Sequence, residues 1–518
     1  MLRTVVVFYF ILSLSPSNAL IPQPVSFYIF PQYYLLPYHI DYDHNAPFCF
    51  TLHTAIRRLL ESLSNQHLVR DLTTSFYGNI TFLNIKLLTP CNELIGPVYP
   101  IENSKEDHWI DIHDGVINIT ATEVWGALHA LTSITQLVRS TSLNEKYLPG
   151  AKIYDYPRWP FRSFLLDTSR HFIPLPYILQ FLRAMSTVKM NVFHWHFIDD
   201  QSFPYESYTF PRLSQKGSYS PYRAIYTQQD VRIIIEYARS LGIRVMPEVD
   251  SPGHTTSWGY GYSAIMTQCS SSLAQPDAIG ILNPIKNVTY NFVGSLLAEI
   301  TNVFPDNALH LGGDEVNFTC WRMNSEIRDF MHKMGFGDNY KRLENYYFEN
   351  LFNKINEVVS KKLKMYVWQE IFDDSVKTNS SVVIHVWKGG AWKAELDAIT
   401  RTGKEVIFSA CWYLNYIRGG EDWIDFYRCD PGTFTNRSEQ LALLKGGGAA
   451  MWGEFVDHTN LMSRSWPRGA AVGERLWSPS SATDINGMRI RLFNFRCFLL
   501  SMGLGAEPVT GPGYCDLS

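Results

Sequence analysis

Two adjacent carboxylates in the middle of the chain are the residues best suited to chemistry. Residues 310–315 read HLGGDE, so Asp314 and Glu315 follow two glycines at the end of an apolar stretch. Neighbouring acids repel each other's negative charge, which favours the protonated form that a general acid needs. Gly312 and Gly313 allow a sharp turn and the close approach of a ligand. The pattern favours acid-catalysed cleavage of a glycosidic bond; the alternative is an acidic surface loop.

Short apolar stretches alternate with helical patterns from about residue 160 onward, which is typical of βα units around a parallel sheet. Eight units predict an α/β fold of the (β/α)8 TIM barrel type, whose catalytic groups lie at the C-terminal strand ends. A doubly wound open sheet is the alternative. Helical patterns between the strands include residues 176–188, 228–241 and 341–360. The predicted strands are residues 163–167, 191–197, 243–249, 308–312, 365–369, 382–387, 405–410 and 447–452.

Polar and aromatic side chains follow every predicted strand. A barrel brings all eight strand ends to one mouth, and flat aromatic rings stack on the faces of sugars. We therefore expect a carbohydrate pocket there. Its candidate residues are Asp167, Arg170, His196, Asp199, Glu248, His254, Asp314, Glu315, Trp368, Trp387, Tyr413, Asn415, Trp452 and Glu454.

The segment before the barrel predicts a small α/β domain at residues 20–152. It contains extended runs at 25–30 and 80–88 and helical patterns at 54–64 and 123–139. Two prolines between residues 154 and 160 interrupt any regular element, which favours a boundary there. The remainder, 153–518, is expected to hold the barrel, a C-terminal helix and a tail.

Residues 1–19 have the pattern of a secretory signal peptide, with Arg3 before an apolar run and small residues at the end. The run has about half of the ~20 residues that a membrane span needs, and no later stretch is long enough. We expect a soluble mature chain in the secretory pathway. Asn317 lies two residues beyond Glu315, where a glycan would crowd the site, so we expect it to be unmodified. Glycosylation is expected at Asn79, Asn118, Asn287, Asn379 and Asn436.

Charge and cysteine content limit the classes of function. The formal net charge is −4, and no basic block indicates nucleic-acid binding. The eight cysteines form no C-x-x-C pair, so disulfides are favoured over zinc in a secreted chain. A local bridge between Cys497 and Cys515 would clamp the C-terminal tail. The residues alone leave the other pairings open.

Six short segments of the sequence resemble those of the lysosomal β-N-acetylhexosaminidases of glycoside hydrolase family 20. They are LDTSRH at 166–171, HWH at 194–196, PGH at 252–254, LGGDE at 311–315, WYLN at 412–415 and WGE at 452–454. The resemblance implies a two-domain protein with a catalytic barrel. It implies an exo-acting retaining enzyme that removes terminal β-linked N-acetylglucosamine or N-acetylgalactosamine at acid pH. The resemblance implies no cofactor. It implies a homodimer and a lysosomal or extracellular location.

The family mechanism implies a role for each matching residue. The substrate's own 2-acetamido group acts as nucleophile and forms an oxazolinium intermediate, which is the substrate-assisted exception among retaining glycosidases. Glu315 would be the acid and base, and Asp314 would hold the acetamido group. The remaining roles are hydroxyl binding by Arg170, Asp199 and Glu454, pocket walls from Trp368, Trp387 and Trp452, a hydrogen bond to the acetamido carbonyl from Tyr413, support of the acid pair by His254, and substrate contact by Asn415.

The resemblance also implies three disulfides, and one residue beside the pocket departs from the family pattern. Tyr416 replaces the arginine of the family subunit that accepts charged sugars, so activity on sulfated substrates is left open. Cys411 and Cys429 are either free or a fourth bridge. The implied pairs are Cys49 with Cys91, Cys269 with Cys320, and Cys497 with Cys515.

Two rival functions use the same residues. His194 and His196 are separated by one residue on a predicted strand, so their side chains point to the same face. Together with Asp199, Asp200 and His254 they could bind a metal, which would make the protein a metal-dependent barrel hydrolase. We favour packing roles for the two histidines and predict no metal, because the other strand ends offer tryptophans and acids. The second rival is a non-catalytic glycan-binding protein on the same scaffold.

Overall fold

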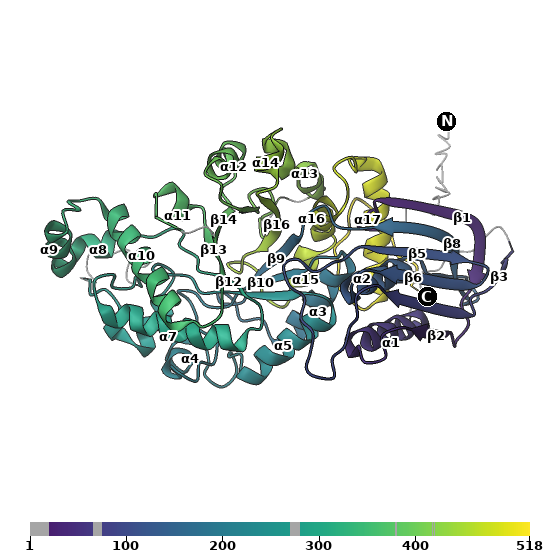
Figure 1. Cartoon of the computed structure of the whole chain (residues 1–518), viewed down its shortest axis with the longest axis horizontal. Coiled ribbons are helices and arrows are strands. Elements are labelled where there is room, and N and C mark those ends of the chain that lie inside the picture. Colours follow the sequence, from purple (N-terminus) through teal and green to yellow (C-terminus); the bar gives the residue numbers. More distant parts are fainter. Residues whose placement is uncertain are drawn as a thin grey trace, which may run out of the picture.

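The computed structural model describes residues 20–65, 75–269, 280–378, 381–416, 418 and 420–517. The predicted signal peptide and the sequon at Asn379 lie outside the described residues. The chain folds into an N-terminal sheet at one end of the molecule and a barrel at the other (Figure 1). Within the described ranges, no helix combines the length and apolar character needed to cross a membrane.

Eight parallel strands close into a barrel in the order β10-β11-β12-β13-β14-β15-β16-β9. Closure by the pairing of β16 with β9 excludes the doubly wound open sheet. Each predicted strand matches one of these within three residues. Their bounds are β9 (Phe161–Asp167), β10 (Val192–His196), β11 (Arg244–Glu248), β12 (Ala308–His310), β13 (Lys364–Trp368), β14 (Val382–Val386), β15 (Val406–Phe408) and β16 (Leu444–Met451).

Helices surround the barrel and cover the outer side of its strands (Figure 1). The three predicted helices are α3 (Leu175–Thr187), α5 (Gln228–Ser240) and α10 (Tyr340–Val358). The remaining helices range from single turns within loops to long helices. The others are α4 (Arg212–Gly217), α6 (Thr256–Gly261), α7 (Asn287–Val303), α8 (Thr319–Met323), α9 (Ser325–Lys333), α11 (Glu370–Asp373), α12 (Trp392–Arg401), α13 (Trp423–Arg428), α14 (Ser438–Leu441), α15 (Leu461–Ser465), α16 (Arg468–Trp477) and α17 (Ile485–Ser501), with 3-10 turns η2 (Ser263–Ile265) and η4 (Pro431–Phe434).

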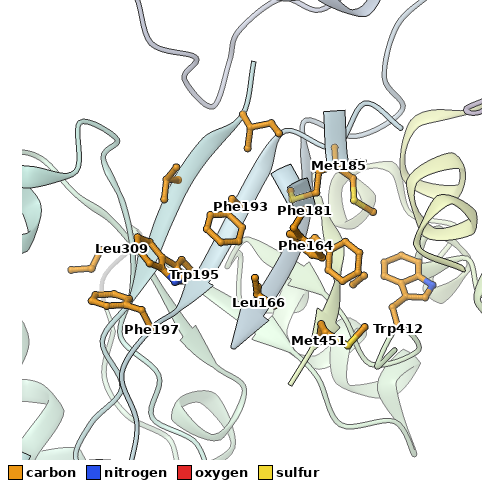
Figure 2. Packing of buried hydrophobic residues seen from close by; sticks show 14 of the residues in the cluster. Phe164, Leu166, Phe181, Met185, Phe193, Trp195, Phe197, Leu309, Trp412 and Met451 are labelled. Atoms are coloured by element: carbon orange, nitrogen blue, oxygen red, sulfur yellow. The ribbon is translucent and has the colours of Figure 1, made fainter. Parts of the chain in front are cut away.

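The barrel strands are apolar because both of their faces are buried, as in parallel sheets generally. On the outer side, Phe164 of β9 packs edge-on against Phe181 of α3, with ring centroids 4.8 Å apart. Figure 2 shows these rings beside Phe193 and Trp195 of β10. On the inner side, a separate layer that includes Phe161 fills the barrel. The continuous apolar runs follow from this double burial.

The N-terminal sheet has helices on one face only. α1 (Phe50–Asn65) and α2 (Val124–Leu137) contribute to its core, and alternate strand residues point away from them. The strand order is β2-β4-β6-β5-β8-β1-β3, with β7 beside β8. β8 continues to Asp155, three residues past the predicted boundary, because it stays paired with β5. The strands are β1 (Ser26–Leu35), β2 (Asp41–His44), β3 (Gly78–Asn79), β4 (Phe82–Leu87), β5 (His108–His113), β6 (Val116–Ala121), β7 (Arg139–Ser140) and β8 (Lys146–Asp155).

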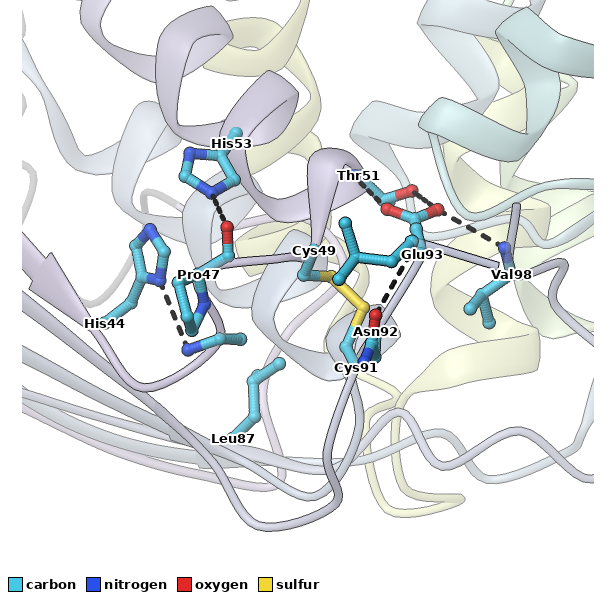
Figure 3. The surroundings of a disulfide bond; sticks show 12 residues. His44, Pro47, Cys49, Thr51, His53, Leu87, Cys91, Asn92, Glu93 and Val98 are labelled. Carbon is cyan, nitrogen blue, oxygen red and sulfur yellow. Dashed lines mark hydrogen bonds between the residues drawn. A yellow bond between two sulfur atoms is a disulfide. The ribbon is translucent and has the colours of Figure 1, made fainter. Parts of the chain in front are cut away.

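Four disulfides pair all eight cysteines of the sequence. Beside the Cys49–Cys91 bridge, Glu93 accepts the backbone N–H of Thr51 at 2.7 Å. Glu93 also forms a 2.8 Å ion pair with Arg239 of α5, so the loop after Cys91 contacts a helix of the barrel. Figure 3 shows Glu93 and Thr51 around that bridge. The three pairs implied by the family are present, and the fourth joins the two cysteines that were left open. The bridges are Cys49–Cys91, Cys269–Cys320, Cys411–Cys429 and Cys497–Cys515.

Buried charges join the sheet to the barrel. Glu106, just before β5, accepts a hydrogen bond of 3.0 Å from Arg162 of β9 and lies 2.9 Å from His129 of α2. Burial alone would raise the pKa of Glu106, but Arg162 and His129 lower it to about 2. A second pair joins Lys189 to Asp155 at 2.6 Å. The interface therefore depends on matched charges without access to water.

We predict that Glu106→Gln destabilises the protein by about 3–5 kcal/mol at pH 7, because the Arg162 guanidinium stays buried without its counter-charge. The folded-state pKa lies below the ordinary 4.5, so the contribution is complete above about pH 4.5 and is lost as the pH falls toward about 2. Denaturant unfolding of both proteins at pH 7 and pH 3 measures this.

The matched control is Glu61→Gln. Glu61 lies 3.9 Å from Arg57, and the two side chains are 66% and 71% exposed, so the expected loss is at most about 0.5 kcal/mol. Equal losses in the two variants would contradict a structural role for the buried pair.

Candidate active site

A cavity of about 480 Å³ opens at the carboxyl ends of the barrel strands. It brings together eight of the predicted site residues and adds two that sequence reasoning did not propose as ligand contacts, Tyr416 and Phe455. Both added residues are exposed aromatics at the pocket wall, and exposed position could not be read from the sequence. The lining residues are Arg170, Asp314, Glu315, Trp387, Tyr413, Asn415, Tyr416, Trp452, Glu454 and Phe455.

The loop after β12 presents the two acids. Gly312 and Gly313 have φ values of +64° and +95°, and Glu315 itself has a φ of +51°. A side-chain carbon at position 312 would lie 1.7 Å from the Asp250 carboxylate oxygen, and that oxygen accepts the Gly313 N–H at 2.8 Å. Asp314 is half-buried and Glu315 is exposed. The loop thus holds one acid against the pocket floor and its neighbour toward the opening.

His254 lies among three carboxylates. Its Nδ1 is 3.2 Å from Asp199, and its Nε2 is 3.9 Å from Asp314 and 4.0 Å from Asp250. Burial alone would lower the pKa of His254, but these carboxylates raise it well above its usual value. Burial and the nearby Asp314 raise the pKa of Asp250 well above its usual value. The resulting imidazolium places a positive charge 3.9 Å from the Asp314 carboxylate.

Arg170 crosses the pocket floor between two acids. Its guanidinium is 3.1 Å from Asp167 and 2.8 Å from Asp199, and it lies 5.1 Å from the centre of the Trp452 ring. Asp199 is fully buried. Its oxygens face Arg170, His196 and His254, so it contacts the pocket lining through Arg170. A direct contact of Asp199 with sugar hydroxyls stays a prediction.

Aromatic rings form the pocket wall. Tyr413 stacks on Trp387 at 6.1 Å and on Tyr416 at 5.7 Å, with interplanar angles of 28° and 19°. Burial raises the pKa of Tyr413 well above its usual value, so its hydroxyl keeps its proton. The Trp387 indole donates to Glu370 at 2.9 Å, a partner that the sequence did not reveal. Trp368 is almost completely buried and packs 6.1 Å from Trp452, beneath the wall.

Buried histidines surround Glu248 inside the barrel. Its carboxylate lies 2.8 Å from His194, 2.9 Å from His196 and 3.3 Å from His310. Burial alone would lower the pKa of His196, but Glu248 and Asp199 raise it to about 10. Burial lowers the pKa of His194 to about 4. Glu248, His194 and His310 could geometrically hold a cation, yet Glu248 is already paired with the His196 imidazolium, and Asp199 is paired with Arg170.

A barrel mouth with adjacent carboxylates, an arginine and stacked aromatic walls defines an enzyme that acts on carbohydrate. Residues 159–480 match the catalytic domain of glycosyl hydrolase family 20. Beta-hexosaminidase subunit alpha of Bos taurus is 43% identical over 500 residues, which covers 94% of this chain and 92% of the relative. Beta-hexosaminidase subunit beta of Homo sapiens is 40% identical over 514 residues, which covers 97% and 91%.

The fold comparison agrees. The X-ray structure of Flavobacterium johnsoniae chitobiase superposes with a TM-score of 0.81 at 28% identity and covers 94% of this chain and 73% of that one. The chain belongs to glycosyl hydrolase family 20. It is a glycoside hydrolase similar to the beta-hexosaminidases.

The turn after β12 leads to a prediction about Gly312→Ala. The new methyl group would collide with Asp250 and displace the loop that carries both acids, so we expect kcat/KM to fall by at least about 10²-fold. The assay is hydrolysis of a chromogenic β-N-acetylglucosaminide, with thermal unfolding measured in parallel.

Gly335→Ala is the matched control. Gly335 has nearly the same φ, +66°, but a side-chain carbon added there would meet no atom within 4 Å. Both variants carry the backbone cost of about 1–2 kcal/mol for a left-handed residue, and only Gly312→Ala should lose activity. Similar activity in the two variants would contradict the role of the Asp250 contact.

Proposed function

We propose that the protein removes terminal β-linked N-acetylglucosamine and N-acetylgalactosamine from glycoconjugates by substrate-assisted catalysis. The observation that carries this proposal is the pairing of a half-buried Asp314, held beside the His254 imidazolium, with an exposed Glu315 on the same loop. A carboxylate in that protected position is suited to fixing a substrate group electrostatically. Glu315 is the neighbour that is open to a leaving oxygen and to water.

In the first step, the acetamido carbonyl oxygen of the substrate attacks the anomeric carbon. The bond to the leaving oxygen breaks as Glu315 gives that oxygen its proton, and an oxazolinium ion forms. Asp314 offsets the positive charge that develops on the acetamido group. Water then attacks the same carbon, Glu315 takes its proton, and the acetamido group is restored. Two displacements at one carbon retain the β configuration.

The surrounding residues bind the sugar. Tyr413, which keeps its proton, donates to the acetamido carbonyl, while Trp387 and Trp452 enclose the acetamido methyl and the sugar face. Arg170 and Glu454 bind hydroxyls at the pocket surface, where Arg170 offers charge-assisted hydrogen bonds. Asn415 adds a polar contact at the rim. The presence of these residues in the lining of one cavity supports the assignments.

We also propose a cellular location and an oligomeric state for the protein. Four disulfides suit an oxidising compartment, in agreement with a secretory route that leads to the lysosome or the extracellular space. We propose that the protein forms a homodimer, as the family resemblance implies.

The test uses chromogenic β-N-acetylglucosaminide, β-N-acetylgalactosaminide and plain β-glucoside. We expect the wild type to cleave both N-acetyl sugars and not the glucoside, and Glu315→Gln to lose at least about 10²-fold in kcat. Asp314→Asn should also lose kcat, because it no longer offsets the acetamido charge.

Equal cleavage of the plain glucoside would indicate a protein nucleophile and contradict substrate assistance. Binding of N-acetylglucosamine without release of any product would favour the glycan-binding alternative.

A second measurement addresses the metal-dependent alternative. We expect prolonged dialysis against EDTA to leave kcat unchanged, because the positive charges of His196 and Arg170 already offset the negative charges of Glu248 and Asp199. Loss of activity that Zn²⁺ restores would favour a metal-dependent hydrolase.

A further inference from the structure

The outer face of the N-terminal sheet carries an aromatic pair, an exposed Trp109 and a half-buried Tyr154. Trp109 of β5 is 40% exposed and stacks on Tyr154 of β8, with ring centroids 4.8 Å apart and an interplanar angle of 19°. Tyr156 extends the group at 5.4 Å from Tyr154 and is 41% exposed. Stacked rings at the surface of a sheet provide a platform suited to the apolar face of a pyranose.

A glycosylation sequon lies on the same face. In the pairing of β5 with β6, Asn118 is opposite Asp111 and Thr120 is opposite Trp109. The burial patterns place Trp109, Asn118 and Thr120 on the side away from α1 and α2. Residues diagonal to each other across two strands lie about 7–8 Å apart. A sugar attached to Asn118 therefore starts within one ring's length of the indole.

One contact of the Asn118 side chain is compatible with a glycan on its amide nitrogen. Its Oδ1 accepts a hydrogen bond of 3.3 Å from the Asn84 amide on the neighbouring strand β4. This leaves Nδ2, the atom that carries an N-linked glycan, without competition from that contact. Attachment of a glycan keeps Oδ1 as an acceptor, so the Asn84 contact is compatible with the modified side chain.

We propose that the outer face is the resting surface of this chain's own N-linked glycan on Asn118, whose first two N-acetylglucosamine residues lie over Trp109 and Tyr154. The amide nitrogen of Asn118 displaces the diphosphate-lipid of an oligosaccharide donor at the anomeric carbon and loses a proton. Charged residues share the face, including Lys152 at 63% and Asp111 at 36% side-chain exposure. This mixture suits a polar glycan better than a second copy of the chain.

The experiment compares glycan sites within one folded molecule. The full chain is expressed in secretory cells that stop at high-mannose glycans and is treated, native or denatured, with an endoglycosidase that cuts between the two core N-acetylglucosamines. Site-resolved mass spectrometry then follows Asn118 and Asn436, which lies exposed in the loop before α14. We expect native Asn118 to be trimmed at least about tenfold more slowly than native Asn436, and both at equal rates after denaturation.

Two variants identify the covering rings. Trp109→Ser should bring the native trimming rate at Asn118 to that of Asn436. Tyr28→Ser removes an aromatic that is 61% exposed on β1, three strands from Asn118, and should leave the protection intact. Hydrolase activity should be unchanged in both and reports correct folding. An unoccupied Asn118, rapid native trimming in the wild type, or protection that survives Trp109→Ser would each overturn the proposal.

Discussion

The backbone conformation after β12 is the constraint on which the pocket depends. Positive φ values at Gly312, Gly313 and Glu315 set the two acids on one short loop. Side chains disfavour this conformation, so the loop needs an external restraint to keep it. Asp250 supplies it from the end of β11 by accepting the Gly313 N–H and filling the space beside Gly312. The acids are therefore positioned by packing between strand ends rather than by local propensity.

A buried series of charges supports this arrangement from below. Glu248 contacts His196, which contacts Asp199, and Asp199 in turn contacts both Arg170 and His254. Charges of opposite sign alternate along the series. Burial makes each unmatched charge costly, so the members hold one another in a single arrangement. Arg170, which lines the pocket, and His254, which lies beside Asp314, thus owe their orientation to this buried series.

Much of this architecture could be predicted from the sequence, because alternation of apolar runs and helical patterns is a local signal. It located all eight strands and, through them, the cluster of Asp314, Glu315 and the tryptophans. The burial of Asp199 and the Glu370 partner of Trp387 were not predictable in this way. They depend on loops from different strands meeting in space. β8 runs three residues beyond the predicted domain boundary because it stays paired with β5 up to Asp155, and it ends before Pro157 and Pro160.

The Cys411–Cys429 bridge has a consequence for where the enzyme can mature. It closes a ring of 18 residues in sequence separation that begins beside Tyr413 and Asn415. Closing a loop of this size is worth about 3 kcal/mol in restricted chain freedom. A chain made in a reducing cytosol could still form its apolar barrel, yet this part of the pocket wall would be tied down only by weaker contacts. The covalent restraint on this part of the pocket wall therefore forms only where the two thiols can be oxidised.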